Sequence, residues 1–382
     1  MNRLFDGAFG RYLVPGIVLQ SVLIGGGYAT GREIVEYGAK YGALGWIGGL
    51  TIFIGFTIMA ILTFELARMF QAYDYRSLMK RLIGPFWVLY DIIYLLLAIL
   101  IISIMASATG EILENTLGLN YWVGVIGVAA IVGVLNFYGK GLIEKFKTFG
   151  TAALFIGYII FGILVISTTW DQAKEVLSSG DTSYMSGEVS LLSVLWSGIL
   201  YVGYNLAVYP ATLFTIKRQK ARKESVISGI IAGVLMTIPW FLTYISILGF
   251  YPSENVLGAS VPWLEMLNGY SYWVIILFGI VVGWTLIETS SGMIHAFLDR
   301  INQHIVEKRH RQLTKPQQAL VAMGALALSV ILARVGVINL ISKGYTWMGY
   351  GMIIVYALPM LTLGVRYIFK KQSKHNSMTK EM

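Results

Sequence analysis

The sequence predicts an all-α integral membrane protein with ten transmembrane helices, which form two inverted repeats of five. Three observations carry this prediction: the composition, ten apolar runs, and interruptions at matching places in the first and sixth runs. Hydrophobic residues make up 56% of the 382 residues and charged residues 13%, about half the charged share of soluble domains. So few charged residues cannot cover a water-facing surface, which excludes a soluble enzyme. The chain has no cysteine, so disulfides and thiolate chemistry are excluded as well.

Ten apolar runs, each bounded by charged or turn residues, are long enough to cross a bilayer. They cover residues 11–40, 43–69, 85–110, 121–137, 147–167, 189–216, 224–250, 271–299, 317–334 and 344–368. The first run follows Arg3 and Arg11 as in a signal peptide. It continues without a small-residue cleavage site, so we expect it to be retained as a helix.

The distribution of basic residues predicts the orientation. If the N-terminus is cytoplasmic, five of the 29 Lys and Arg fall on the outer side: Arg32, Lys40, Lys174, Arg334 and Lys343. Such a positive-inside pattern predicts a multi-pass protein of a bacterial inner or plasma membrane, with both termini cytoplasmic. It also accounts for the net charge of +9, so the expected partner is the anionic bilayer and not nucleic acid.

Helix-breaking residues lie at comparable depth in the first and sixth runs. They are Gly25, Gly26 and Gly27, followed by Tyr28, in the first run, and Gly203, Asn205 and Pro210 in the sixth. In a helix interior, glycine costs about 1 kcal/mol and proline about 3 kcal/mol against alanine. We therefore expect an unwound stretch in each run. The halves 11–167 and 189–368 would then each begin with an interrupted helix, as in inverted-repeat transporters.

Unwound backbone at this depth is tolerated only inside protein or beside a watery cavity. Free N–H groups at a half-helix attract an anion, and free carbonyls attract a cation. We therefore expect a site for a small zwitterion and a cation, with the N–H groups of residues 26–28 facing the carboxylate. Tyr201 and Tyr204 could wall the pocket. The alternatives are core packing for these aromatic residues and close helix packing for the glycines.

The eighth run supports the cation. Its polar residues recur at spacings of three and four, which puts them on one helical face directed into the bundle: Thr285, Glu288, Thr289, Gly292 and His295. Ser290 and Ser291 widen this face, and hydroxyl and carbonyl oxygens suit a hard cation. Hydrogen bonds to the helix's own backbone are the alternative for these hydroxyls.

Four charged residues near the site have open roles. Glu288 is a structural acid, a proton carrier or a carboxylate that a bound cation keeps ionised, because an unpaired charge at this depth costs at least about 3 kcal/mol. Arg32 and Glu33, just outside the site, form an outer gate or extend to the headgroups. Glu65 is expected to pair locally with Arg68, three residues later. No metal-ligand spacing or acid pair appears in any run, which disfavours an enzyme.

The stretch Gly25–Glu33, which reads GGGYATGRE, and the YVGYN of Tyr201–Asn205 resemble the YkvI-like family of bacterial membrane proteins. That family is similar to the amino acid, polyamine and organocation (APC) transporter superfamily, which has the LeuT fold. The resemblance covers residues 11–368. It implies ten helices in a 5+5 inverted repeat, with helices 1 and 6 interrupted.

Two smaller matches imply roles for individual residues. Thr289-Ser290-Ser291 resembles the hydroxyl cluster of the sodium site in sodium-coupled relatives. This implies that the side chains of Thr289 and Ser290, with the carbonyls of Val22 and Gly25, bind sodium. The segment around Glu65 is similar to an acidic second-helix segment that braces the broken helices. The interior of the fifth run lacks the lysine that replaces sodium in proton-coupled relatives, which favours sodium.

Together these features predict a secondary active transporter that carries an amino acid or similar small zwitterion with sodium by alternating access. No other cofactor is expected. The predicted solute site contains Gly25, Gly26, Gly27, Tyr28, Tyr201, Gly203 and Asn205. The alternatives are a proton-coupled transporter of the same fold and a membrane sensor that binds without transport. The oligomeric state is left open.

Overall fold

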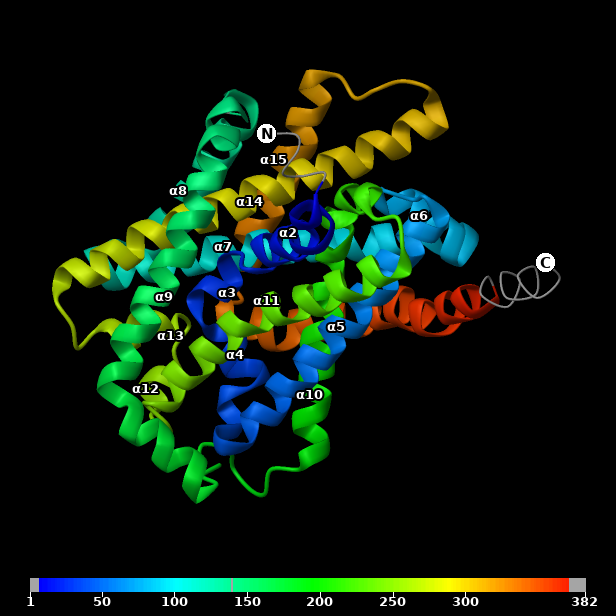
Figure 1. Ribbon diagram of the computed structural model, residues 1–382. Coiled ribbons are helices and arrows are strands. Elements are labelled where there is room, and N and C mark those ends of the chain that lie inside the picture. The colour runs from blue at the N-terminus through cyan, green and yellow to red at the C-terminus, as the bar shows by residue number, and fades with distance from the viewer. Residues whose placement is uncertain (1–6, 139, 371–382) are drawn as a thin grey trace.

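The computed structural model describes residues 7–138 and 140–370, and every regular element in these ranges is a helix (Figure 1). Eight helices are long: α5 (Gly45–Phe70), α7 (Trp87–Leu117), α8 (Tyr121–Tyr138), α9 (Lys140–Ser179), α10 (Leu191–Asn205), α11 (Arg222–Leu248), α14 (Tyr272–Arg309) and α15 (Lys315–Ala333). Shorter helices begin the chain: η1 (Phe9–Leu13), α2 (Val14–Leu23), α3 (Gly26–Thr30), α4 (Arg32–Tyr37) and η2 (Ala39–Leu44). Others follow the long helices: α6 (Tyr75–Ile83), η3 (Gly84–Phe86), the 3₁₀-helix η4 (Leu206–Arg218), α12 (Glu254–Leu257), α13 (Pro262–Leu267), α16 (Val337–Asn339), η5 (Leu340–Tyr345), α17 (Thr346–Met352), η6 (Ile353–Ala357) and η7 (Met360–Gly364).

Eight helical segments of the described chain are long and apolar enough to cross a membrane. They overlap eight of the ten predicted runs. The first and fourth runs correspond to shorter apolar helices, Phe9–Leu23 and Tyr121–Asn136. The first is short because the helix ends at Leu23, where the glycines begin. The all-helical membrane protein is confirmed, while the count of ten and the inverted repeat stay predictions.

The outer surface carries large apolar side chains that would be unfavourable in water. Trp273 on α14 and Leu192 on α10 expose 74% and 73% of their surface, and exposed isoleucines recur along α9. Continuous apolar surface of this extent drives soluble proteins to associate. Here it is the surface that contacts lipid tails.

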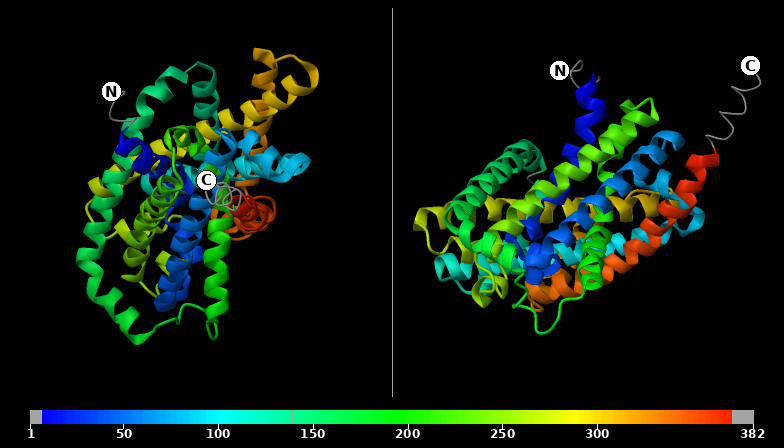
Figure 2. Two further views of the ribbon diagram at one scale, coloured as in Figure 1. Left: turned by 45° about the vertical axis from the view of Figure 1, so that its right-hand side comes forward. Right: turned by 60° about the horizontal axis from the view of Figure 1, so that its bottom comes forward.

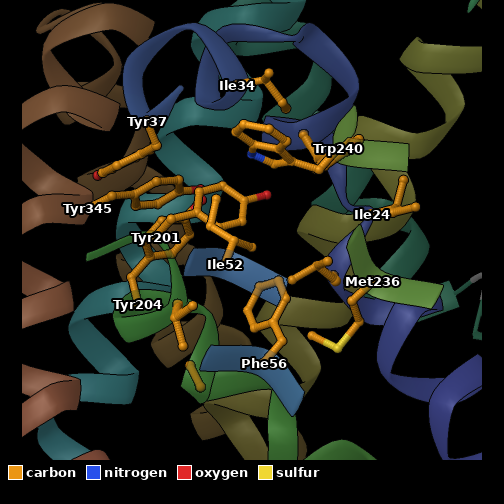
Figure 3. Packing of buried hydrophobic residues seen from close by; sticks show 14 of the residues in the cluster. Ile24, Ile34, Tyr37, Ile52, Phe56, Tyr201, Tyr204, Met236, Trp240 and Tyr345 are labelled. Carbon is orange, nitrogen blue, oxygen red and sulfur yellow. The ribbon is translucent and has the colours of Figure 1, made fainter. Parts of the chain in front are cut away.

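The centre of the molecule is aromatic. Figure 3 shows Tyr37, Tyr201, Tyr204 and Tyr345 grouped together, with Trp240 of α11 under Ile34. Tyr204 and Tyr345 stack with ring centroids 4.3 Å apart. Since these side chains come from α4, α10, α11 and η5, they hold the first, sixth, seventh and last segments of the bundle together.

Helices α5 and α11 pack closely against each other and run side by side through the middle of Figure 1. Gly229 of α11 lies directly against Ile61 of α5, and Gly233 lies against Thr57. A side chain at either glycine would displace these residues. Small residues at a spacing of four allow helix backbones to approach in this way in membranes.

Two opposite faces of the bundle carry different sets of contacts. On one face, Arg11 pairs with Glu224 at 2.6 Å, Arg68 donates to the carbonyl of Lys220, and Lys80 pairs with Glu307. We call this the basic face. In the right-hand view of Figure 2, the blue and red ends of the described chain both lie in the upper part of the picture. The opposite face includes α12, α13 and the contact of Ala43 N–H with the carbonyl of Asp181.

The short helix α6 lies on the basic face and has a defined N-cap. Asp74 accepts hydrogen bonds from the backbone N–H and the hydroxyl of Ser77, at 2.9 and 2.6 Å. We expect Asp74→Ala to destabilise α6 by about 1 kcal/mol, because one helix-terminal N–H loses its acceptor. Faster hydrogen exchange of the α6 amides would report the change. Asp74→Asn, which keeps a capping oxygen, is the control and should exchange at the original rate.

Candidate functional site

The first span is interrupted at its three glycines, as the sequence predicted. Helix α2 ends at Leu23, Ile24 is non-helical, and Gly25 is extended with φ −93° and ψ −170°. Helix α3 restarts at Gly26, and its first backbone bond runs from Ala29 N–H to the carbonyl of Gly25. The amides of residues 26–28 therefore have no acceptor within the helix. The surroundings of Gly26 lie outside the described residues.

A second interruption, not expected from the sequence, separates α3 from α4. Gly31 has φ +83°, a left-handed conformation that favours glycine. A side chain at Gly31 would also lie 3.0 Å from the ring of Trp263. The turn directs Glu33 back toward the interruption at Gly25. Our expectation that Glu33 lies outside the site is therefore wrong.

The sixth span does not unwind at Gly203. Helix α10 continues through Gly203 to Asn205 and then changes to the 3₁₀-helix η4, which contains Pro210. A Cβ atom at Gly203 would lie 3.0 Å from the carbonyl of Gly349, so this glycine allows close packing against α17. The Asn205 amide donates to the carbonyl of Tyr201 at 2.8 Å. The predicted gap is thus replaced by a change of helix type after Asn205.

A cavity of about 320 Å³, here called the central cavity, begins at the first interruption. Its closed end is lined by Gly27, Tyr28, Glu33, Tyr204 and Tyr345, all packed deep in the protein. Its other end is lined by Ala211, Asp299 and Gln303, which are exposed. The central cavity therefore opens toward the basic face and is closed toward the opposite face.

Glu33 is the acid at the closed end. It is 5% exposed, and its Oε2 accepts a hydrogen bond of 2.6 Å from the hydroxyl of Tyr204. Its Oε1 lies directly against Gly27, in the space that a side chain at residue 27 would fill. None of the ion pairs among the described residues includes Glu33. A buried carboxyl group without a cationic partner is costly, which marks Glu33 for function.

Three of the four predicted sodium ligands lie together. A Cβ atom on Gly25 would be 3.3 Å from the hydroxyl of Thr289 and 3.8 Å from the carbonyl of Val22. Ser290 is not part of this group. It lines a seam between α7, α8 and α15 together with Ile102 and Val128, because successive residues of an α-helix are rotated by about 100°.

The face of α14 that lines the central cavity differs from the predicted face. It consists of Thr289, Met293, Ala296, Asp299, Arg300 and Gln303. Only Thr289 belongs to both. The Thr285 hydroxyl donates to the carbonyl of Val281 in its own helix, which is the alternative role given above for these hydroxyls. Gly292 is exposed. Glu288 is half-buried and is not among the cavity-lining residues that the structure describes.

The predicted gating residues lie on opposite faces. Arg32 is buried and donates to the carbonyls of Leu257 and Ala259 before α13, so it is tied to the closed side and does not extend to the headgroups. Glu65 pairs with Arg68 at 2.6 Å on the basic face, as the local-pair interpretation expected.

Two predicted solute ligands differ in their surroundings. Tyr28 lines the central cavity. Tyr201 is buried against the rings of Tyr37, Phe56 and Tyr204 and does not line the cavity that the described residues form. Core packing, the alternative for Tyr201, is therefore the interpretation that its contacts support.

The sequence did not predict that an arginine lies at the open end of the central cavity. Arg300 binds Asp91 of α7 and lies 3.4 Å from the ring centroid of Tyr94 and 3.8 Å from that of Tyr75. Arg76 of α6 extends the group to Glu307 at 2.6 Å. Arg300 is not among the residues that the sequence predicts for the site. Its spacing of eleven residues from Thr289, close to three helical turns, is the signal that could have placed it in the cavity.

A comparison with known sequences found a relative that matches most of the chain. The chain resembles YkvI, an uncharacterised membrane protein of Bacillus subtilis (strain 168). The two sequences are 23% identical over 344 residues, which cover 87% of this chain and 90% of YkvI. The resemblance predicted from residues 25–33 is thereby confirmed. No protein family model matches the chain.

Several solved structures have a similar fold. A Na⁺-coupled sialic acid symporter, substrate-bound and outward-open, is 14% identical, with 94% of this chain and 88% of that chain covered and a TM-score of 0.53. Mhp1 in an inward-facing conformation is 18% identical, with 91% and 76% covered and a TM-score of 0.53. A manganese transporter of Eremococcus coleocola is 14% identical, with 94% and 79% covered and a TM-score of 0.52. These likenesses confirm that the chain shares the overall helical fold of these solved transporters.

Proposed function

We propose that this protein is a secondary active transporter that carries a small nitrogen-containing organic solute with sodium by alternating access. An amino acid or similar zwitterion is the solute class predicted from the sequence. The observation that carries the proposal is the central cavity, which begins at the first interruption and opens toward one face. Its volume of about 320 Å³ lies at the lower end of small-molecule pockets, roughly 300–1,000 Å³.

The positive-inside pattern makes the basic face cytoplasmic, so the conformation described here is inward-open. Transport then requires a second conformation, in which the contacts of Arg32 with Leu257 and Ala259 break and the open end closes. The ion-pair group of Arg300, Asp91 and Arg76 connects α14, α7 and α6 at that end. Movement of these three helices toward the first span would close it.

Sodium would bind between the two parts of the first span and α14. The carbonyls of Val22 and Gly25 and the hydroxyl of Thr289 supply oxygen ligands, which suit a hard cation. Bound sodium would hold Gly25 against α14 and so stabilise the cavity wall. It would raise solute affinity, and the solute would raise sodium affinity by the same factor.

Uptake into proteoliposomes tests the proposal. With an imposed sodium gradient, pooled labelled amino acids and amines should accumulate; one charge moving through 100 mV contributes about 2.3 kcal/mol, roughly fiftyfold in accumulation. Equal uptake in potassium would rule out sodium coupling. Uptake driven by a pH gradient alone would indicate the proton-coupled alternative. Solute binding without counterflow would indicate a sensor.

Replacement of Thr289 tests the sodium site. Thr289→Ala removes a hydroxyl oxygen beside Gly25, and we expect the sodium concentration for half-maximal uptake to rise by about tenfold. Thr289→Ser, which keeps the hydroxyl, is the control and should behave like the original protein. If Thr289→Ala retains the original sodium dependence, the cation binds elsewhere.

A further inference from the structure

We infer that the solute is an organic cation, an amine without a neighbouring carboxylate, and that Glu33 binds its ammonium group. This inference rests on the proposed function and names the solute class of the same cavity. It changes the class predicted from the sequence, where the free amides of residues 26–28 were expected to bind a solute carboxylate.

The position of Glu33 disfavours a solute carboxylate at those amides. Its Oε1 lies directly against Gly27, so the protein's own carboxyl group already stands beside the start of α3. A second carboxylate about 4 Å away would lose roughly a thousandfold in affinity at an effective dielectric constant of about 20. An ammonium group at the same place gains by a similar interaction.

The only cation among the described lining residues is too far away to bind the carboxylate of an amino acid. This residue is Arg300, which lies eleven residues beyond Thr289 on α14, about 16 Å along the helix axis. Thr289 is level with Gly25, and Glu33 lies against Gly27. An α-amino acid carries both charges on one carbon atom, so it cannot reach Glu33 and Arg300 together. Arg300 is also already paired with Asp91.

The walls around Glu33 suit an organic ammonium group. Tyr28, Tyr204 and Tyr345 line the closed end, and aromatic rings attract ammonium groups that have lost their water. The Tyr204 hydroxyl orients the carboxyl group through its 2.6 Å hydrogen bond. Farther along the cavity, Leu97, Ala98, Ile101 and Met293 are apolar. This order of groups fits a primary amine with an aliphatic or aromatic body.

Matched pairs of compounds test the inference on the full chain. Isoamylamine and leucine share one side chain, as do tyramine and tyrosine, and each pair differs in the carboxylate. We expect both amines to bind at least tenfold more tightly than their amino acids, measured by thermal shift and by counterflow in proteoliposomes. Tighter binding of leucine than of isoamylamine would overturn the inference.

Two variants assign the effect to the carboxylate. Glu33→Gln keeps the shape and removes the charge, and it should weaken isoamylamine binding by roughly thirtyfold or more. Glu175→Gln makes the same change at an exposed position of α9 and should leave binding unchanged. If Glu33→Gln does not fold, Tyr204→Phe keeps the charge but removes its orienting hydroxyl, and it should weaken amine binding by about tenfold.

Unchanged amine affinity in the folded Glu33 variant would overturn the inference. Loss of sodium dependence alone would also overturn it, because Glu33 would then bind the coupling ion. Failure of the proposed function can be distinguished from failure of this inference. If no compound shows counterflow but isoamylamine binding depends on Glu33, transport is wrong and the ligand class stands. If leucine is transported and isoamylamine is not, transport stands and the ligand class is wrong.

Discussion

Gly27→Ala is expected to weaken solute binding in the central cavity strongly while the chain still folds. The added methyl group would occupy the space of Glu33 Oε1 and approach the Tyr345 hydroxyl within 3.2 Å. The carboxyl group is the end of a flexible side chain, so it can turn away, but it then loses Tyr204 and its place at the closed end. We expect solute affinity to fall by roughly thirtyfold, measured by thermal shift and counterflow.

The helix itself should tolerate Gly27→Ala, because alanine is favoured over glycine in helices by about 1 kcal/mol. Gly324→Ala on α15 is the control, since no atom lies within 4 Å of its added Cβ. This variant should bind and transport like the original protein. Original affinity in Gly27→Ala would mean that Glu33 does not contact the solute at its present position.

Arg300→Met is expected to destabilise the protein by about 3 kcal/mol or more. Arg300 and Asp91 are both buried, and removal of Arg300 leaves Asp91 with only the more distant Arg76, at 3.9 Å, as its cationic partner in the interior. The contacts of the guanidinium with the rings of Tyr94 and Tyr75 are lost as well. A lower Tm of the purified protein in detergent would report the loss.

Two further variants separate charge from packing in this group. Arg309→Met makes the same change at an exposed position at the end of α14, and its Tm should stay within a degree or two of the original. The double variant Asp91→Asn with Arg300→Met should be more stable than Arg300→Met alone, because the carboxylate that has lost its closest cationic partner is then removed as well. A double variant that is no more stable would show that the charge of Asp91 carries little of the effect.

The interrupted spans show where local rules suffice. Three successive glycines remove side-chain packing and helix propensity at one place, so the interruption after Leu23 follows from the sequence. Gly203 and Asn205 lie in a continuous helical path, since tertiary packing of Gly203 on Gly349 stabilises α10 through the predicted gap. A single glycine has two uses, and the neighbouring helix decides between them.

The face of α14 shows where such rules fail. Periodicity alone groups Thr285, Glu288, Thr289, Gly292 and His295, but a rotation by about one residue puts Met293, Ala296 and Arg300 into the cavity with Thr289. Polar and apolar residues both line a cavity that admits water and a solute. Hydrophobic patterning therefore does not identify the lining face of a membrane helix, which contacts protein, lipid or cavity on different sides.

The amino-acid sequence by itself determined that this chain is a helical membrane protein with a broken first span, because composition, run length and glycine propensity act locally. The resemblance of the sequence to a known family also predicted that Val22, Gly25 and Thr289 lie close together. Only the tertiary structure decided that Glu33 enters the cavity, because the left-handed turn at Gly31 sets the direction of α4. It also joined Arg300 to Asp91, residues far apart in the chain that only the packing of α14 on α7 brings together.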